Sequence, residues 1–268
     1  MPLRMDRLKA KLTLIPGLIS RALAQVPLVA TRRCILCGHG VGRFLPFEGG
    51  TAAAPKLMVA LNVVGSDVDQ FSCPCCLAHD RERHLFLYLN ESGLLARLPS
   101  MSVIHFAPET RLASKIRDQQ PLRYIACDLA PSSAQITRAD LQCMPFESQT
   151  FDLLIANHVL EHVDDASAAL AEIHRVLRVG GHAILQTPFS ADLEQTWEDP
   201  GIITPQARLQ AYGQSDHARL FGRDIFAMIV SAGLESRVRS HDELLPRFDP
   251  AIFGVNRFEP FFLFQRCT

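Results

Sequence analysis

Residues 151–188 read FDLLIANHVLEHVDDASAALAEIHRVLRVGGHAILQTP, and this stretch decides the fold. The apolar run at 151–156 is typical of a buried strand, the spacing at 166–177 predicts an amphipathic helix, and 182–186 predicts a second strand after a glycine turn. Strand, helix and strand in this order indicate a parallel β-α-β unit. Ligands of open α/β sheets bind beyond the carboxyl ends of the strands, so we expect functional residues in the loop after the first strand. The polar residues of that loop are Asn157, His158, Glu161 and His162.

The same alternation of strand and helix continues from about residue 101. Further strands are predicted at 102–107, 122–127, 135–139, 234–239 and 260–265, and further helices at 84–98, 108–119 and 222–232. Seven strands that alternate with helices predict an α/β fold built on a doubly wound sheet.

Composition and charge give a broad class. The chain has 268 residues, 48% of them hydrophobic, and a net charge of −1, which fits one cytoplasmic globular domain with a smaller attachment. The charge is uneven, because residues 1–48 carry eight basic and two acidic side chains, which leaves about −7 for the remainder. A basic N-terminal arm favours contact with a membrane surface, a polyanion or an acidic patch on the protein itself.

Residues 1–30 are predicted to form a basic amphipathic segment, with Leu8, Leu12 and Ile15 on one helical face. A cleaved targeting signal is the alternative, because basic residues precede an apolar run and residues 22–24 (ALA) resemble a cleavage site. Pro16 interrupts that run and favours the amphipathic helix. No run approaches the ~20 apolar residues that a membrane-spanning helix needs.

The cysteines predict a metal site. Two of the eight form a C-x2-C motif, Cys34 and Cys37, and two more form a second, Cys73 and Cys76. Two such pairs let four thiolates converge on one zinc ion, and four protein ligands leave no open position for catalysis, so the predicted zinc is structural. The 35 residues between the pairs exceed the usual ribbon spacing, so a hairpin or loop is expected at 44–71.

Other thiols and imidazoles leave the ligand set open. Cys75 could replace a member of the second pair, and His39 or His79 could stand in for a thiolate. Free thiols or a disulfide are the alternatives to a metal. The remaining cysteines lie in strand-like or loop contexts and are predicted to be inert core residues: Cys127, Cys143 and Cys267.

Two aspartates predict a nucleoside site. Asp128 ends the second strand of the doubly wound sheet, where a carboxylate accepts hydrogen bonds from both ribose hydroxyls. Asp140 ends the third strand and precedes the apolar side chain of Leu141, which suits an adenine ring and its exocyclic amine. Each aspartate alone could be a loop residue or helix cap, but at the ends of adjacent strands they favour a nucleoside together.

The loop after the first strand reads HFAPE at 105–109 and lacks the G-x-G-x-x-G pattern. A pyrophosphate pocket needs glycines so that backbone amides can approach the ligand, and their absence disfavours NAD and FAD. A nucleoside with an amino-acid tail tolerates this loop, and Glu109 could pair with the ammonium group of the tail.

The sequence resembles the class I S-adenosylmethionine-dependent methyltransferases in the order of five segments: HFAPE, ACDL, DLQCMPF, FDLLIANHVLEHVDD and HRVLRVGGHAILQTP. It resembles more narrowly a bacterial subgroup in which a zinc-ribbon-like CxxC…CPxC module precedes the fold and APE replaces the glycine-rich loop. CPCCLAHDRER, HFAPE and WEDPGIITPQARLQAYGQSDHARLFG carry this narrower resemblance, which covers about residues 34–240.

The resemblance implies a Rossmann-like, doubly wound, seven-stranded methyltransferase sheet with a small zinc-ribbon-like module. It implies a division into the N-terminal segment 1–30, the module and linker helix 31–90, and the methyltransferase domain 91–268 with a lid insertion at 190–221. Its cofactors would be S-adenosylmethionine and a structural zinc ion. The residues expected to bind the methyl donor are Ala107, Pro108, Glu109, Asp128, Leu129, Asp140, Leu141, Asn157 and His158.

Methyl transfer requires a group that collects the proton of the acceptor. His217 in the lid is the first candidate, because an imidazole titrates near neutral pH, and Asp216 could orient it or bind substrate. A structural Asp216–His217 hydrogen bond that closes the lid is the alternative. His158, after the fourth strand, is the second candidate, and Arg219 could clamp a polar group of the acceptor.

These features predict a methyltransferase that acts on a small molecule, with transfer to a hydroxyl oxygen of a sugar or secondary metabolite. An RNA methyltransferase that uses the zinc module is one alternative, but the module lacks the interleaved aromatic and basic residues of a strand-binding platform. A non-catalytic adaptor with a methyltransferase fold is the other. The missing glycine loop favours the adaptor, and the two strand-end aspartates disfavour it.

Overall fold

The computed structural model describes residues 31–268. The amphipathic segment predicted at 1–30, and its contact with a membrane surface, lie outside the described residues. Among residues 31–268, every helix is too short or too polar to cross a bilayer.

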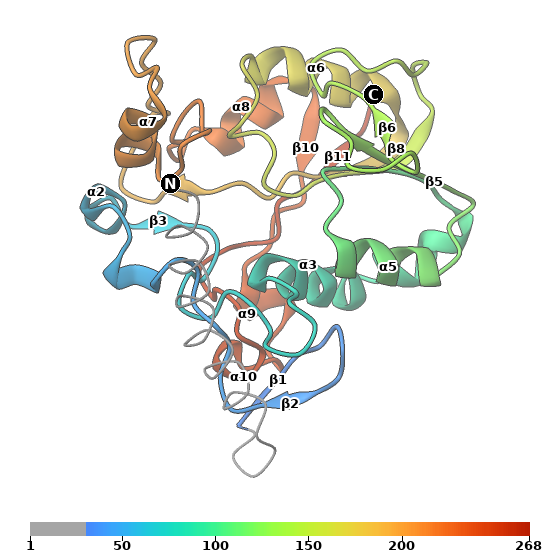
Figure 1. Cartoon of the computed structure of the whole chain (residues 1–268). Helices are drawn as coiled ribbons and strands as arrows, with labels where there is room; N and C mark the ends of the chain where they lie inside the picture. The colour runs from blue at the N-terminus through green and yellow to red at the C-terminus, as the bar shows by residue number, and fades with distance from the viewer. Residues whose placement is uncertain (1–30) are drawn as a thin grey trace, which may run out of the picture.

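A seven-stranded sheet in the order β10-β11-β8-β7-β4-β5-β6 forms the centre of the molecule (Figure 1). The strands are β4 (Ser102–Phe106), β5 (Arg123–Asp128), β6 (Thr137–Arg138), β7 (Phe151–Ala156), β8 (Leu177–Ile184), β10 (Leu234–Ser236) and β11 (Leu263–Arg266). Strands β6, β5, β4, β7 and β8 are parallel, and β11 is antiparallel to both β8 and β10. The prediction of an α/β fold built on a doubly wound, Rossmann-like, seven-stranded sheet is confirmed.

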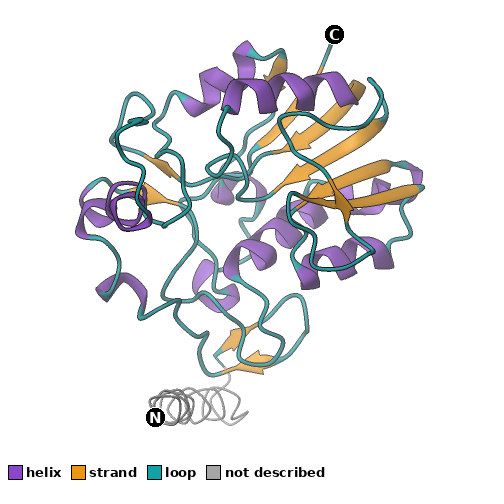
Figure 2. Ribbon diagram, turned by 45° about the horizontal axis from the view of Figure 1, so that its top comes forward, coloured by secondary structure: helices purple, strands orange, loops and turns teal. Residues whose placement is uncertain are grey.

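Helices cover both faces of this sheet (Figure 2). One face, which includes Ile104 and Leu154, packs against α6 (Ala166–Val176) and α8 (Ile225–Ser231). The alternate side chains, among them Val103 and Leu153, face α3 (Asp80–Glu91), α4 (Leu94–Arg97) and α5 (Thr110–Asp118). Because neighbouring side chains of a strand point to opposite faces, strands that are covered on both sides read as continuous apolar runs.

One predicted boundary is wrong. The glycine pair at 180–181 does not turn the chain before a strand, because it lies inside β8. Phe151 pairs with Leu177, whereas Leu153 pairs with His182, so β8 carries extra residues opposite β7. Gly180 has a φ of +83°, a conformation that glycine adopts at no steric cost, and the strand bulges without leaving the sheet.

The part of the chain that carries the cysteine pairs contains more than a two-stranded ribbon. Strand β1 (Arg32–Arg33) pairs with β2 (Gly40–Val41), and the chain then forms the turn η2 (Gly50–Ala52), helix α2 (Lys56–Ala60) and strand β3 (Val63–Val64). Strand β3 pairs antiparallel with β9 (Phe189–Ser190), which follows β8. The segment at 44–71, where a hairpin or loop was predicted, contains η2, α2 and β3 and forms no hairpin of its own, because β3 pairs with β9.

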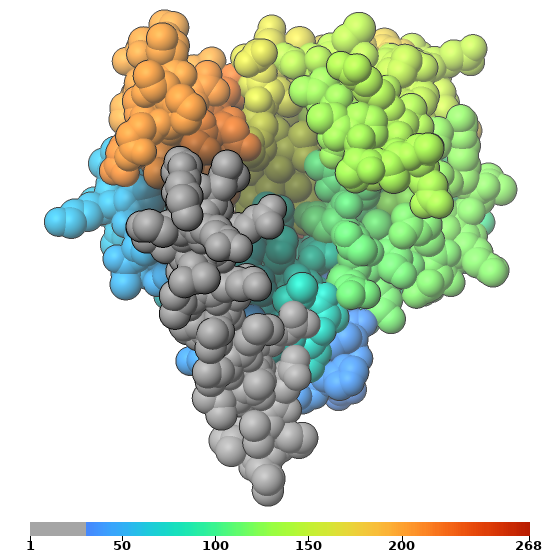
Figure 3. Space-filling model, in the orientation of Figure 1, coloured from blue at the N-terminus to red at the C-terminus, as the bar shows by residue number. Residues whose placement is uncertain are grey.

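Residues 190–221, the segment predicted to be a lid and called the lid below, contain helix α7 (Pro205–Tyr212). Tyr212 and Leu220 of the lid bury against Met58 of α2. In Figure 3 the orange atoms of the lid lie directly above the blue atoms of the α2 region. Arg219 is buried, pairs with Glu198 at 2.7 Å, and donates to three carbonyl groups of the loop after β7. Arg219 therefore holds the lid against that loop. All its N–H groups are already used, so it cannot bind a polar group of the acceptor as predicted.

A fully buried arginine, Arg83 of α3, joins the N-terminal part to the C-terminal loops. Its five N–H groups donate to the carbonyl oxygens of Gln70, Phe71, Ala78, Phe253 and Gly254. The guanidinium carbon also lies 3.9 Å from the ring centroid of Phe44. Gly254, at a φ of +61°, ends helix α10 (Pro250–Phe253), and a Cβ there would collide with Phe44 and approach Arg83. Helix α9 (His241–Leu244) and turn η3 (Leu98–Ser100) pack into the same hydrophobic core as α3.

Candidate functional site

A cavity of about 580 Å³ opens at the carboxyl ends of β4, β5, β6 and β7, and we call it the strand-end cavity. Six of the nine residues predicted to bind the donor line it: Ala107, Asp128, Leu129, Asp140, Leu141 and His158. Pro108, Glu109 and Asn157 do not line it. Sequence reasoning missed several other members of the wall, including Arg81, Gln142, Asp164 and Gln214.

The two strand-end aspartates differ in their surroundings. Asp128 accepts a hydrogen bond from the amide of Ala130 through Oδ1, and among residues 31–268 its Oδ2 has no hydrogen bond. Asp140 accepts from both the amide and the side chain of Gln142, so a tight turn fixes its carboxylate. Asp128 therefore has a free oxygen for a ligand hydroxyl, whereas Asp140 is held at the wall by its own loop.

Two residues with side chains take the left-handed backbone conformation at this wall. Ala107, directly after β4, has a φ of +45°, and His158, after β7, has a φ of +55°. Such conformations cost energy for residues other than glycine and cluster at functional sites. The APE loop therefore makes with alanine the kind of turn that glycine usually makes, which the lack of a glycine motif concealed.

At the start of α5, next to this loop, backbone amides already donate hydrogen bonds to a side chain of the protein itself. Oε2 of Glu82 accepts hydrogen bonds from the amides of Arg111 at 3.1 Å and Leu112 at 3.0 Å. Glu109 precedes the helix and accepts from the side chain of Asn157 at 2.6 Å. Burial opposes the charge of Glu109, but His105 and Arg81 keep the pKa of its carboxyl below the ordinary value.

His158 lies between two buried carboxylates. Its Nδ1 is 3.3 Å from Oε1 of Glu161, and its Nε2 is 3.3 Å from Oε1 of Glu259. Burial opposes protonation of the ring, but the hydrogen bonds to these two carboxylates raise the pKa of His158 to about 9. The side chain is therefore an imidazolium at neutral pH, with both N–H groups engaged. This geometry disfavours His158 as the group that accepts a proton.

The ion pairs of His158 make stability depend on pH. An unfolded histidine titrates near pH 6.5, and the folded protein raises the pKa to about 9. The stabilisation is therefore full below pH 6.5 and is lost as the pH rises through 9. We expect the free energy of unfolding in urea to fall by roughly 2 kcal/mol more between pH 6.5 and 9.5 in the native protein than in His158→Gln, which cannot titrate. Equal pH slopes would contradict the ion pairs.

His217 has the opposite state. It is 3% exposed, and its Nδ1 lies 2.9 Å from the carbonyl oxygen of Tyr212, which can only accept, so Nδ1 carries the proton. Nε2 is buried and has no hydrogen bond among residues 31–268. Burial lowers the pKa of the ring, so His217 is neutral at neutral pH and presents a lone pair on Nε2.

Asp216 makes no hydrogen bond to His217, so it does not orient that ring, which was one of its two predicted roles. Its carboxylate lies 3.3 Å from Nδ1 of His162, whose ring stands perpendicular to that of His217 with 4.7 Å between the centroids. Glu161, His162 and His217 bring one ligand atom each within 4.8 Å of one another. Such a group can hold a proton or a cation. Glu161 already accepts from the hydroxyl of Thr187 and pairs with His158, which favours proton handling.

A second cavity, of about 430 Å³, lies between the lid and residues 51–68, and we call it the lid cavity. It is lined by His217 and by Ser66, whose hydroxyl has no hydrogen bond within the described part of the chain. His158 and Gln214 belong to the walls of both cavities, so the two spaces adjoin. Sequence reasoning did not foresee that residues 51–68 form this wall, because no motif marks them.

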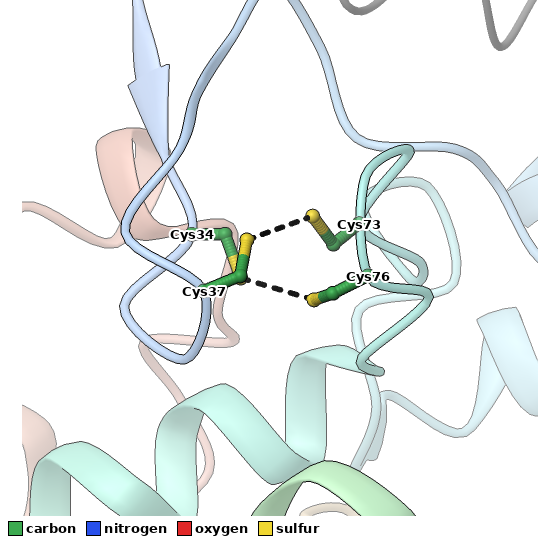
Figure 4. A group of neighbouring side chains, drawn as sticks. All are labelled: Cys34, Cys37, Cys73 and Cys76. Atoms are coloured by element: carbon green, nitrogen blue, oxygen red, sulfur yellow. Dashed lines mark hydrogen bonds between the residues drawn. The ribbon is translucent and has the colours of Figure 1, made fainter.

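The four predicted cysteines converge, Cys34 and Cys37 from one turn and Cys73 and Cys76 from another (Figure 4). The sulfur atoms of Cys34 and Cys76 lie 3.7 Å apart, and those of Cys37 and Cys73 lie 3.9 Å apart. Zinc–sulfur bonds of about 2.3 Å in a tetrahedron place sulfur atoms about 3.8 Å apart. The four thiols therefore fit a zinc ion.

The other candidate ligands lie outside this group. Cys75 is not a member, Nδ1 of His39 contacts the carbonyl of Cys37, and the ring of His79 stacks on Phe71. Cys127 is buried, as predicted for a core residue. Cys143 and Cys267 are exposed, so the core prediction is wrong for them, because both lie in surface loops at the ends of short strands.

Residues 110–185 match the family model described as a methyltransferase domain. The biotin biosynthesis bifunctional protein BioHC of Saccharophagus degradans is 26% identical over 116 residues, which are 40% of this chain and 20% of that protein. The ubiquinone/menaquinone biosynthesis C-methyltransferase UbiE of Desulfotalea psychrophila is 30% identical over 125 residues, 46% of this chain and 48% of that protein. The chain thus spans less than half the length of these curated relatives.

Among solved structures, the S-adenosylmethionine-dependent methyltransferase from Mesorhizobium loti aligns with a TM-score of 0.45 and 14% identity. The alignment covers 66% of this chain and 96% of that chain. The YcgJ protein from Bacillus subtilis aligns with a TM-score of 0.41 and 15% identity, over 59% of this chain and 76% of that one.

Proposed function

We propose that this protein is an S-adenosylmethionine-dependent methyltransferase that acts on a hydroxyl group of a small molecule. The methyl donor occupies the strand-end cavity and the acceptor occupies the lid cavity. The observation that carries the proposal is that the two cavities adjoin at His158 and Gln214, beside the free lone pair of His217. The methyltransferase-domain match at 110–185 supports it, because this range contains the ends of β5, β6 and β7.

The bound donor would supply a methyl group on a sulfonium, which is already a good leaving group. The chain therefore has three tasks: to align the acceptor, to exclude water and to collect one proton. Asp128 binds the ribose hydroxyls through its free oxygen, and Asp140 and Leu141 face the adenine. Nε2 of His217 takes the proton of the acceptor hydroxyl, and Glu161 stabilises the imidazolium that forms.

The wall of the lid cavity supports an uncharged acceptor. Among residues 31–268, those that line this cavity include neither Lys nor Arg, and the charged ones are Asp67 and His158. Recognition of phosphates in RNA relies on Lys and Arg, so this wall disfavours the RNA alternative. The volume of about 430 Å³ also fits a small molecule. A sugar or a hydroxylated secondary metabolite meets both conditions.

Incubation of the protein with methyl-labelled S-adenosylmethionine and fractionated cell extracts tests the proposal. We expect label in a small neutral product whose methyl group is bound to oxygen. Label on carbon, the acceptor atom in the name of UbiE, would keep the enzyme class and overturn the oxygen assignment. Calorimetry that detects neither the donor nor its demethylated product would favour the adaptor instead.

Asp128→Ala is expected to weaken donor binding by about 2 kcal/mol, or roughly 30-fold, because the ribose hydroxyls lose a charged acceptor. Calorimetric titration with S-adenosylhomocysteine measures the effect. Asp118→Ala, an exposed change at the end of α5, serves as the control and should bind like the native protein. An unchanged dissociation constant for Asp128→Ala would mean that the ribose lies elsewhere.

We propose further that Cys34, Cys37, Cys73 and Cys76 hold a single structural zinc ion. Elemental analysis of the purified protein is expected to find one zinc per chain. Cys73→Ser should lose the metal and lower the melting temperature, whereas Cys75→Ser and Cys143→Ser should retain it. Full zinc content in Cys73→Ser would contradict this ligand set, and loss of zinc from Cys75→Ser would add Cys75 to it.

A further inference from the structure

The donor proposed above carries an amino-acid tail, and the fold leaves its carboxylate without the usual partner. In open α/β sheets the N-terminus of the helix after the first strand is a ready anion site, because its amides point at the ligand. Here the amides of Arg111 and Leu112 at the start of α5 already donate to Glu82. Glu82 also adds a negative charge that repels a second carboxylate. The tail must therefore find its cation elsewhere.

Arg81 of α3 lines the strand-end cavity, on the residue before Glu82. Its Nε is buried and makes no hydrogen bond among residues 31–268, although it lies 3.5 Å from Oε1 of Glu109. A guanidinium presents its N–H groups as a fork that matches a carboxylate. Arg81 thus places a guanidinium in the wall of the cavity, and Glu109, which does not itself line the cavity, lies next to it.

The other charged residues of this wall do not compete for the role. The imidazolium of His158 is held by Glu161 and Glu259, and His162 is paired with Asp216. The remaining charges of the described wall are carboxylates: Asp128, Asp140, Asp164 and Asp216. Among residues 31–268, Arg81 is therefore the only residue with a guanidinium or ammonium group that lines the strand-end cavity.

We infer that Arg81 binds the carboxylate of the donor's methionine tail, so that the cysteine module completes the donor site in place of a glycine-rich loop. This inference rests on the proposed function. It also links the module to donor binding. The carbonyl of Cys76 accepts from Nε of Arg111, and Glu82 accepts from the amide of His79, so the second cysteine turn, the start of α3 and the start of α5 are joined.

Three ligands separate this role from a structural one. S-adenosylmethionine carries the whole tail, its decarboxylated form keeps the ammonium and lacks the carboxylate, and methylthioadenosine lacks both groups. We expect Arg81→Gln to bind S-adenosylmethionine about 10- to 100-fold more weakly, the range of a lost charged hydrogen-bond pair. Its affinity for the two truncated ligands should equal that of the native protein. Arg81→Lys, which keeps the charge but not the fork, should fall between.

Calorimetry on the full chain gives each affinity, and Arg97→Gln, an exposed change on α4, is the matched control. Equal affinity of native protein and Arg81→Gln for S-adenosylmethionine would overturn the inference. A parallel loss for all three ligands would overturn it as well, since it would show that Arg81 only supports the fold. Native protein that binds neither S-adenosylmethionine nor methylthioadenosine would overturn the proposed function itself, and the inference with it.

Discussion

Arg83→Met is expected to destabilise the protein by about 3–5 kcal/mol, the scale of removing one side of a buried charged network. The change removes a donor from five carbonyl oxygens around a fully buried side chain, and only that of Ala78 keeps another backbone donor among the described residues. The methionine also cannot stack on Phe44 as the planar guanidinium does. Urea unfolding followed by circular dichroism measures the loss, and a large effect would appear as poor soluble yield.

Two further variants make the Arg83 experiment decisive. Arg247→Met removes an arginine whose side chain is 78% exposed and pairs with Glu91 at the surface. Such pairs contribute less than about 1 kcal/mol, so this variant should be close to native. Arg83→Lys keeps the charge but cannot direct five donors in one plane, and it should remain strongly destabilised. A loss below about 1 kcal/mol in Arg83→Met would refute the role of this side chain as the junction.

His217→Ala is expected to lower kcat by about 100-fold or more while donor affinity stays unchanged, because the loss of a general base costs that much. The native enzyme should lose activity below the pKa of His217, which burial holds under its ordinary value, and should keep a flat profile at neutral pH. This acid limb should vanish in the variant. Steady-state rates with saturating acceptor, measured across this pH range, test both points.

Asp216→Asn gives the matched comparison for His217. Because Asp216 pairs with His162 and not with His217, its loss should lower kcat less than tenfold. Near-normal turnover of His217→Ala would mean that solvent or another group accepts the proton of the acceptor. Equal losses in the two variants would mean that the lid, rather than the imidazole, had been damaged.

The strands and the cysteine site could be predicted because their signals are local. Residues 153–156 and 183–184 are apolar throughout, because both faces of these two strands are buried. Asp128 could be placed at the cavity because a residue that ends a parallel strand must lie at the ligand edge. The C-x2-C spacing in turn brings two sulfur atoms to the same side of one tight turn.

The rest depends on partners that lie far away in the chain. The charge state of His158 depends on Glu161 and also on Glu259, a hundred residues later, and no local pattern connects His158 to Glu259. Arg83 reads as an exposed helix residue until the carbonyls of Phe253 and Gly254 are in place. Strand β3 has only two residues, too few for a periodic signal, and its pairing with β9 follows from the position of the lid.

The junction at Arg83 bears on the order of events during synthesis. The cysteine turns are synthesised long before Phe253 and Gly254, which lie far later in the chain. Until then the nascent chain would hold the ionised side chain of Arg83 with part of its acceptors missing, so residues 31–97 cannot reach their final packing alone. A fragment that stops after α4 would therefore be a poor candidate for separate expression, and a truncation that removes Phe253 and Gly254 would destabilise the packing around Arg83.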